Sequence, residues 1–109
     1  MTEAMLPLGS VIKVKDTKGK WMVVGRGTID EQNQIWSYTC VPHPAGLFDI
    51  TKLFSLSADQ VQEVVFEGYS TPSSAQIAQI TADFIDGKIQ AEDLRIWNIC
   101  SQNRRKVNR

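Results

Sequence analysis

A change in the spacing of apolar residues at Thr71-Pro72 constrains the fold of this chain more than any other feature of its sequence. Before this point, short runs of alternating apolar and polar residues are separated by turn residues, a pattern typical of β-strands. After it, apolar residues recur at helical intervals, and threonine followed by proline is a typical helix start. The sequence therefore predicts a β-rich region followed by a helical one.

Four strands are predicted in the β-rich region. They span residues 11–15, 21–25, 35–41 and 63–67. Turn residues, Gly19 among them, separate the first three strands, which we expect to form an antiparallel meander. The second strand is apolar on both faces, so we expect it in the centre of the sheet. Pro42 ends the third strand, because proline cannot donate to a strand ladder.

The segment from Phe54 to Val61 has an ambiguous pattern, although Ser57 is a typical N-cap for one short helical turn. In the neighbouring strands, the alternation of side chains predicts which residues face the core. The predicted core residues of the sheet are Trp36, Val64 and Phe66, with Tyr38 and Cys40 on the same face as Trp36.

Two helices are predicted in the helical region. The first begins at Pro72 and is closed by Gly87. Its apolar stripe consists of Ile77, Ile80, Phe84 and Ile85. The second helix starts near Ala91 and runs into a basic tail. We therefore predict an α+β fold that forms one domain over residues 1–109. A small, bent, four-stranded antiparallel sheet (a partial barrel) occupies the β-rich region, residues 6–69. Two C-terminal helices follow in residues 71–109.

Charge is balanced over the whole chain but unevenly distributed along it. Twelve Lys and Arg are balanced by twelve Asp and Glu, so nucleic-acid binding over the whole surface is not expected. Residues 49–93 are acidic, whereas residues 94–109 carry five basic side chains and no acidic one. This distribution can orient a partner or a second copy of the chain. Alternatively, the basic tail is a solvated, frayed end.

The sequence carries no recognisable targeting signal. The longest uninterrupted apolar stretch, residues 21–24, is far too short to span a membrane. Without an export signal, Cys40 and Cys100 are expected to be reduced thiols. The expected location is therefore the cytoplasm, with no membrane partner.

The sequence gives little evidence for a catalytic site or a metal site. His43 is the only histidine, and a nucleophilic pair with Cys40 needs both side chains close together. Residues three positions apart on a strand point to different faces. One histidine and two distant cysteines offer no metal-ligand spacing. We expect no cofactor, no metal and no enzymatic activity, with a small Cys/His hydrolase as the least favoured alternative.

The predicted second helix and the basic tail form a candidate partner-binding region. The helix is apolar around much of its circumference, so it either packs within the monomer or forms an interface. Glu92 and Asp93 in its first turn would repel the phosphates of DNA, which argues against a DNA-recognition helix. The candidate binding residues are Leu94, Ile96 and Trp97 for affinity, Arg104, Arg105 and Lys106 for orientation, and Arg26 in a predicted bulge.

Four short motifs follow one another in the β-rich region: LPLGSV at residues 6–11, GRG at residues 25–27, a Pro44-x-Gly46 loop and VVFEGY at residues 64–69. Together they resemble a small family of Gram-positive bacterial proteins known only as a domain of unknown function. The resemblance covers about residues 6–69. Where the family loop typically has Tyr-Pro-Glu-Gly, this chain has His43-Pro44-Ala45-Gly46.

Members of this family are often encoded among type VII secretion genes, near toxins of the LXG class. The resemblance implies a cytoplasmic accessory protein that binds a protein partner, as an adaptor or chaperone for secretion of such a toxin. An immunity protein that neutralises a cognate toxin is the alternative. The charge distribution also allows a homodimer.

Overall fold

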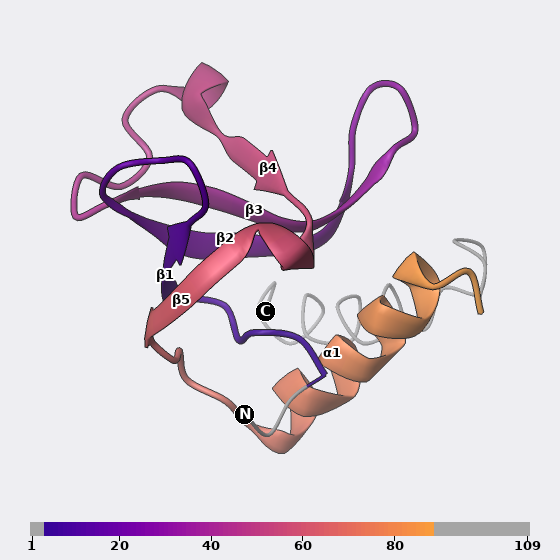
Figure 1. The fold of residues 1–109 in the computed structure, drawn as a ribbon. Helices are drawn as coiled ribbons and strands as arrows, with labels where there is room; N and C mark the ends of the chain where they lie inside the picture. Colours follow the sequence, from indigo (N-terminus) through magenta and orange to yellow (C-terminus); the bar gives the residue numbers. More distant parts are fainter. Residues whose placement is uncertain (1–3, 89–109) are drawn as a thin grey trace, which may run out of the picture.

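One antiparallel sheet of five strands and a single α-helix make up residues 4–88, the part of the chain that the computed structural model describes (Figure 1). The strands are β1 (Val11–Val14), β2 (Lys20–Ile29), β3 (Ile35–His43), β4 (Phe54–Leu56) and β5 (Val61–Phe66), and the helix is α1 (Pro72–Ile85). Short 3₁₀ turns at Ile50–Lys52 and Ala58–Gln60 flank β4. The strand order β4-β3-β2-β1-β5 leaves β4 and β5 at the two edges.

The predicted fold class, an α+β fold with a four-stranded sheet and two helices, is wrong. The sheet contains a fifth strand, β4, which pairs with β3 from Tyr38 to Cys40. Because β4 has only three residues, its sequence is too short to show an alternating pattern, and its contacts with β3 hold it in the sheet. Residues 4–88 contain one α-helix, and the second helix predicted from Ala91 lies outside them.

The middle strands contain an irregularity and an unexpected proline. The register between β2 and β3 shifts between Val23 and Gly25, at the start of the GRG motif, where a bulge was predicted. β2 does not leave the sheet there, because it continues to Ile29. β3 does not end before Pro42, as predicted, but continues to His43. The carbonyl oxygen of Pro42 accepts a hydrogen bond from the Gly46 N–H at 2.7 Å. The backbone of Pro42 therefore faces away from β2, and no ladder bond is lost.

The core lies between the sheet and α1. Its most completely buried strand residues are Ile12, Val14, Val23, Cys40 and Leu56. The segment before β1 adds Met5 and Leu6 to the core, and Figure 1 shows this segment reaching the neighbourhood of α1. The hydroxyl oxygen of Tyr38 accepts a hydrogen bond from the Leu6 N–H at 3.0 Å. This bond ties the segment to β3.

The start of α1 confirms the sequence prediction. Thr71 Oγ1 accepts a hydrogen bond from the Ser74 N–H at 3.0 Å, and Pro72 is the first helical residue. The buried residues of the helix are Ala78, Ile80 and Thr81. A Cβ on Gly27 of β2 would lie 2.6 Å from Thr81 Cγ2, so the helix approaches the strand closely only because this residue is glycine.

The predicted burial of Val64 and Phe66 in β5 is wrong. Val64 and Phe66 are 42% and 60% exposed, although both were expected in the core. Val11 of β1 pairs with Phe66, and the next residue, Ile12, pairs with Val64, which makes Val65 an extra residue in β5. Phe66 thereby shares the face of Val11, and Ile12 points into the core on the other face. The bulge in this edge strand therefore turns Phe66 outward.

Trp36 was also predicted to be a core residue, but it lies outside the core. Its side chain is half-buried, and its Nε1–H donates to Asp30 Oδ2 at 2.9 Å across the turn between β2 and β3. The N–H groups of Gln32 and Gln34 each donate to Asp30 Oδ1 at 2.9 Å. These hydrogen bonds, of which the one from Trp36 contributes most, lower the pKa of the Asp30 carboxyl below its ordinary value. Trp36 therefore helps to close this hairpin.

Candidate functional site

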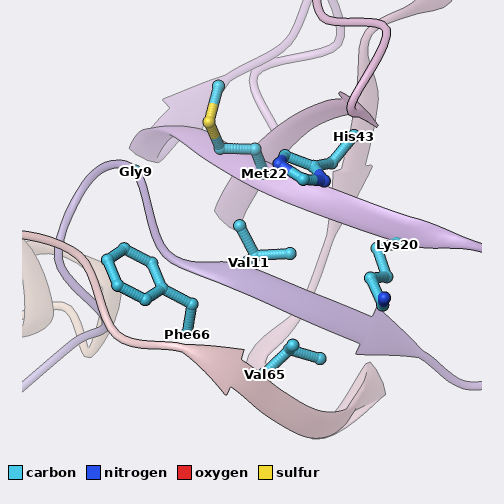
Figure 2. Close-up of a pocket in the computed structure, with 7 residues that line it drawn as sticks. All are labelled: Gly9, Val11, Lys20, Met22, His43, Val65 and Phe66. Atoms are coloured by element: carbon cyan, nitrogen blue, oxygen red, sulfur yellow. The ribbon is translucent and has the colours of Figure 1, made fainter.

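A groove lies over β1 on the face of the sheet opposite the core (Figure 2). This groove, termed the outer groove, has a volume of about 400 Å³. Its lining residues come from the segment before β1 and from four strands: Gly9, Val11, Lys20, Met22, His43, Val65 and Phe66. Figure 2 shows Val11 at the centre, with the two β5 residues on one side of it and Met22 and His43 on the other.

Paired apolar residues form the floor of the outer groove and the surface on both sides of it. Val11 pairs with Phe66 of β5 and with Met22 of β2. Met22 pairs in turn with Val41 of β3. Directly paired residues of antiparallel strands point to the same face of the sheet. An apolar row, Phe66–Val11–Met22–Val41, therefore crosses four strands.

The apolar row is only partly covered by the rest of the chain. Val11 and Val41 are buried, at 7% and 2% exposed, whereas Phe66 and the adjacent Val65 are 60% and 42% exposed. Burying an apolar side chain of a partner against such a surface is worth about 1.5–3 kcal/mol. Exposed apolar patches of this kind commonly mark protein-interaction sites or ligand grooves.

Charged residues lie two positions further along the strands on the same face. Lys13 of β1 pairs with Glu63 of β5, and the Lys13 Nζ lies 3.7 Å from Glu63 Oε1. Lys20 of β2 pairs in register with His43 of β3, and both side chains are exposed. Figure 2 shows Lys20 and His43 toward the same end of the groove. The outer groove is therefore apolar along its floor and basic at one end.

Backbone and side-chain hydrogen bonds join the LPLGSV and VVFEGY motifs near Gly9, at the edge of the groove. Ser10 Oγ donates to the Pro7 carbonyl oxygen at 2.7 Å and accepts from the Gly68 N–H at 2.9 Å. The Gly9 N–H and the Ser10 carbonyl oxygen each form a 2.8 Å hydrogen bond with the backbone of Val23. The two motifs therefore position the strand ends that border the groove.

Arg26 is the only predicted partner-binding residue in the described part of the chain. Its Nη1–H donates to the Leu6 carbonyl oxygen at 3.2 Å, and its side chain is half-buried. It therefore tethers the segment before β1, and it does not line the outer groove. The other predicted binding residues lie outside residues 4–88: Leu94, Ile96, Trp97, Arg104, Arg105 and Lys106.

Cys40 and His43 lie on opposite faces of the sheet. Cys40 is completely buried in the core, and this burial raises the pKa of its thiol to about 12. A thiolate nucleophile therefore does not form at Cys40 near neutral pH. His43 lines the outer groove instead. Among the described residues, no three His, Cys, Asp or Glu side chains are grouped as they would be around a metal ion, and no helix is long and apolar enough to cross a membrane.

Cys40 is expected to be inert to iodoacetamide in the folded protein, because the reagent needs an accessible thiolate. At mildly alkaline pH, Cys40 of the native protein should remain unmodified over a period in which Cys40 of the denatured protein is fully modified. Peptide mass mapping separates the modification of Cys40 from that of Cys100. Equal labelling rates at Cys40 with and without denaturant would contradict its burial.

The outer groove could not be predicted from the sequence, because its residues come from strands that are far apart in the sequence. One usable signal lies in β1, where Val11 alternates with the core residue Ile12 and so places an apolar side chain on the opposite face. The strand order and register must be known before Val11 can be connected to Met22 and Phe66.

Comparison with known proteins places most of the described region in a family. The sequence model of a family described as a domain of unknown function, DUF4176, matches residues 5–77. This span includes the complete sheet and every residue that lines the outer groove. The match confirms that the chain contains a domain of unknown function, as expected. No curated protein and no solved structure matches the chain.

Proposed function

We propose that this chain, which belongs to the DUF4176 family, is a non-enzymatic accessory factor that binds a protein partner through the outer groove. The observation that carries the proposal is the apolar row, which ends in the exposed Phe66 on an edge strand. Edge strands with exposed apolar side chains are surfaces on which another chain packs or pairs.

The position of Cys40 supports binding over hydrolysis. Its thiol is buried and has a raised pKa, and His43 lies on the other face of the sheet. The Cys/His pair of the hydrolase alternative therefore has no activated nucleophile.

The proposed partner is a protein of a type VII secretion locus, and specifically a toxin of the LXG class. The chain would act in the cytoplasm as an adaptor or chaperone before the toxin is secreted. The motif resemblance supports this context, and the outer groove supports the protein-binding role because it offers apolar surface to a client. The balanced net charge supports a protein partner over a nucleic acid.

Co-purification with a toxin of the LXG class from the same organism tests the proposal. The tagged, full-length chain is expected to capture the N-terminal region of that protein. Phe66→Ala should weaken the capture by about fivefold or more, because it removes the aromatic wall of the groove. Phe48→Ala is the matched control: it removes a phenylalanine that is 69% exposed and does not line the groove, and it should leave capture unchanged.

Two outcomes contradict the proposal. Equal capture by Phe66→Ala and Phe48→Ala shows that the groove is not the binding surface. Capture of only the C-terminal toxin domain assigns the alternative function, an immunity protein. Thermal melts of both variants control for folding, and both should resemble the parent because each replaced side chain is exposed.

A further inference from the structure

We infer that the outer groove binds an extended, acidic segment of the partner, in which one residue separates an apolar side chain from a carboxylate. The apolar side chain lies over Val11, between Phe66 and Met22, and the carboxylate pairs with Lys20 beside His43. This inference rests on the proposed function and adds the chemistry by which the partner is recognised.

The floor of the groove is suited to a single apolar side chain. Val11 forms the floor, and Phe66 and Met22 stand on its two sides in Figure 2. A side chain placed over Val11 therefore contacts apolar atoms below it and on both sides. At Gly9, the space that a Cβ would occupy is open, which leaves room for the backbone of the bound segment.

Within residues 4–88, no acidic side chain pairs with the basic end of the groove. Lys13, on the neighbouring strand, is already paired with Glu63 at 3.7 Å. Lys20 is exposed, and within residues 4–88 no acidic side chain forms an ion pair with it. A carboxylate brought to Lys20 therefore gains a charge-assisted contact without breaking an existing one. This charge complementarity selects an acidic segment.

The distance between the two parts of the groove fits an extended chain. Lys20 lies two residues from Met22 on β2, and His43 lies two residues from Val41 on β3. Residues two apart on a strand point to the same face and are separated by about 6.6 Å. An extended segment has the same period, so its apolar residue and its acid two positions away reach the apolar row and Lys20 together.

A second copy of this chain fits the groove less well through its exposed edge strand. That strand, β5, carries Glu63 and is followed by Glu67. Two β5 strands laid against each other bring these like charges close together, which is destabilising. A second copy of the chain is therefore a less suitable occupant of the groove than an acidic segment of a partner.

Peptide titration of the full-length chain, followed through its backbone amide NMR signals, tests the inference. The probes are acetyl-Leu-Thr-Glu-amide and the reverse sequence acetyl-Glu-Thr-Leu-amide, at millimolar concentrations. At least one of them is expected to shift the amide signals of Val11, Met22 and Phe66. Replacing its Glu by Lys, or its Leu by Ala, should raise the Kd about three- to tenfold.

Variants of the chain test the basic end directly. Lys20→Met keeps most of the aliphatic side chain and removes the charge, so the Kd of the better peptide should rise about three- to tenfold at low salt and less at high salt. Lys52→Met is the matched control, because Lys52 is exposed and does not line the groove. It should change the Kd by less than about twofold.

The inference is overturned if no peptide shifts the groove signals, or if the Glu and Lys peptides bind equally well. Concentration-dependent dimerisation that Phe66→Ala abolishes would also overturn it, because a second copy then occupies the groove. If co-purification depends on Phe66 but not on Lys20 or salt, the proposed function stands and the inference fails. If the peptides bind as expected and no LXG region is captured, the inference stands and the proposed type VII context fails.

Discussion

Replacing Leu56 by alanine is expected to lower the free energy of unfolding by about 2–5 kcal/mol. Leu56 lies on the three-residue strand β4, yet none of its surface is exposed, and it packs within the core formed by the sheet and α1. The substitution removes apolar contacts and leaves a cavity that the surrounding strands can fill only in part. Urea denaturation followed by tryptophan fluorescence measures the change.

Leu47→Ala is the matched control for Leu56→Ala. It makes the same chemical change in the loop before β4, at a side chain that is 56% exposed. Its effect on the free energy of unfolding should stay within about 0.5 kcal/mol. Similar losses in both variants would show that β4 does not place Leu56 in the core.

Gly68→Ala is expected to lower the free energy of unfolding by about 3 kcal/mol, because the new methyl group would clash with backbone atoms of the segment before β1. A Cβ at this position would overlap the carbonyl oxygen of Leu8 and lie 2.9 Å from the Ser10 nitrogen. Neither backbone atom can move aside as a flexible side chain could. The same shift would strain the hydrogen bond from the Gly68 N–H to Ser10 Oγ, which is 2.9 Å long. Thermal and denaturant melts measure the loss.

Gly46→Ala separates this clash from the general effect of losing a glycine. Gly46 has a φ of +77°, and nothing lies within 4 Å of the position of its missing Cβ. Alanine at this position should lower the free energy of unfolding by only about 1 kcal/mol, which is the cost of the left-handed backbone conformation. A Gly46→Ala loss as large as that of Gly68→Ala would mean that the two motifs are not packed as tightly as described.

Elements with local causes could be predicted from the sequence. Ser57 begins a short turn because the Gln60 Oε1 accepts a hydrogen bond from the Ser57 N–H at 2.9 Å. Thr71 caps α1 through a residue three positions away, and Gly19 adopts a φ of +80° in its turn. In each case, the partner or the required conformation lies within a few residues of the signal.

The candidate site could not be predicted in this way. The residues expected to bind a partner lie outside residues 4–88, except Arg26, whose side chain holds the segment before β1. The outer groove depends instead on the register that aligns Val11 with both Met22 and Phe66. That register depends on which strands become neighbours, and alternation within one strand contains no information about its neighbours.

By itself, the sequence determined where the chain turns in the β-rich region and where α1 begins, because glycine conformation and helix capping act between residues close in sequence. Only the tertiary structure decided that β5 pairs with β1 at the edge of the sheet and that Ser10 meets Gly68, 58 residues away. It also decided which face Phe66 occupies. One extra residue at Val65 shifts the pairing and reverses the face of the side chains that follow, so Phe66 lines an exposed groove where alternation alone predicts a core residue.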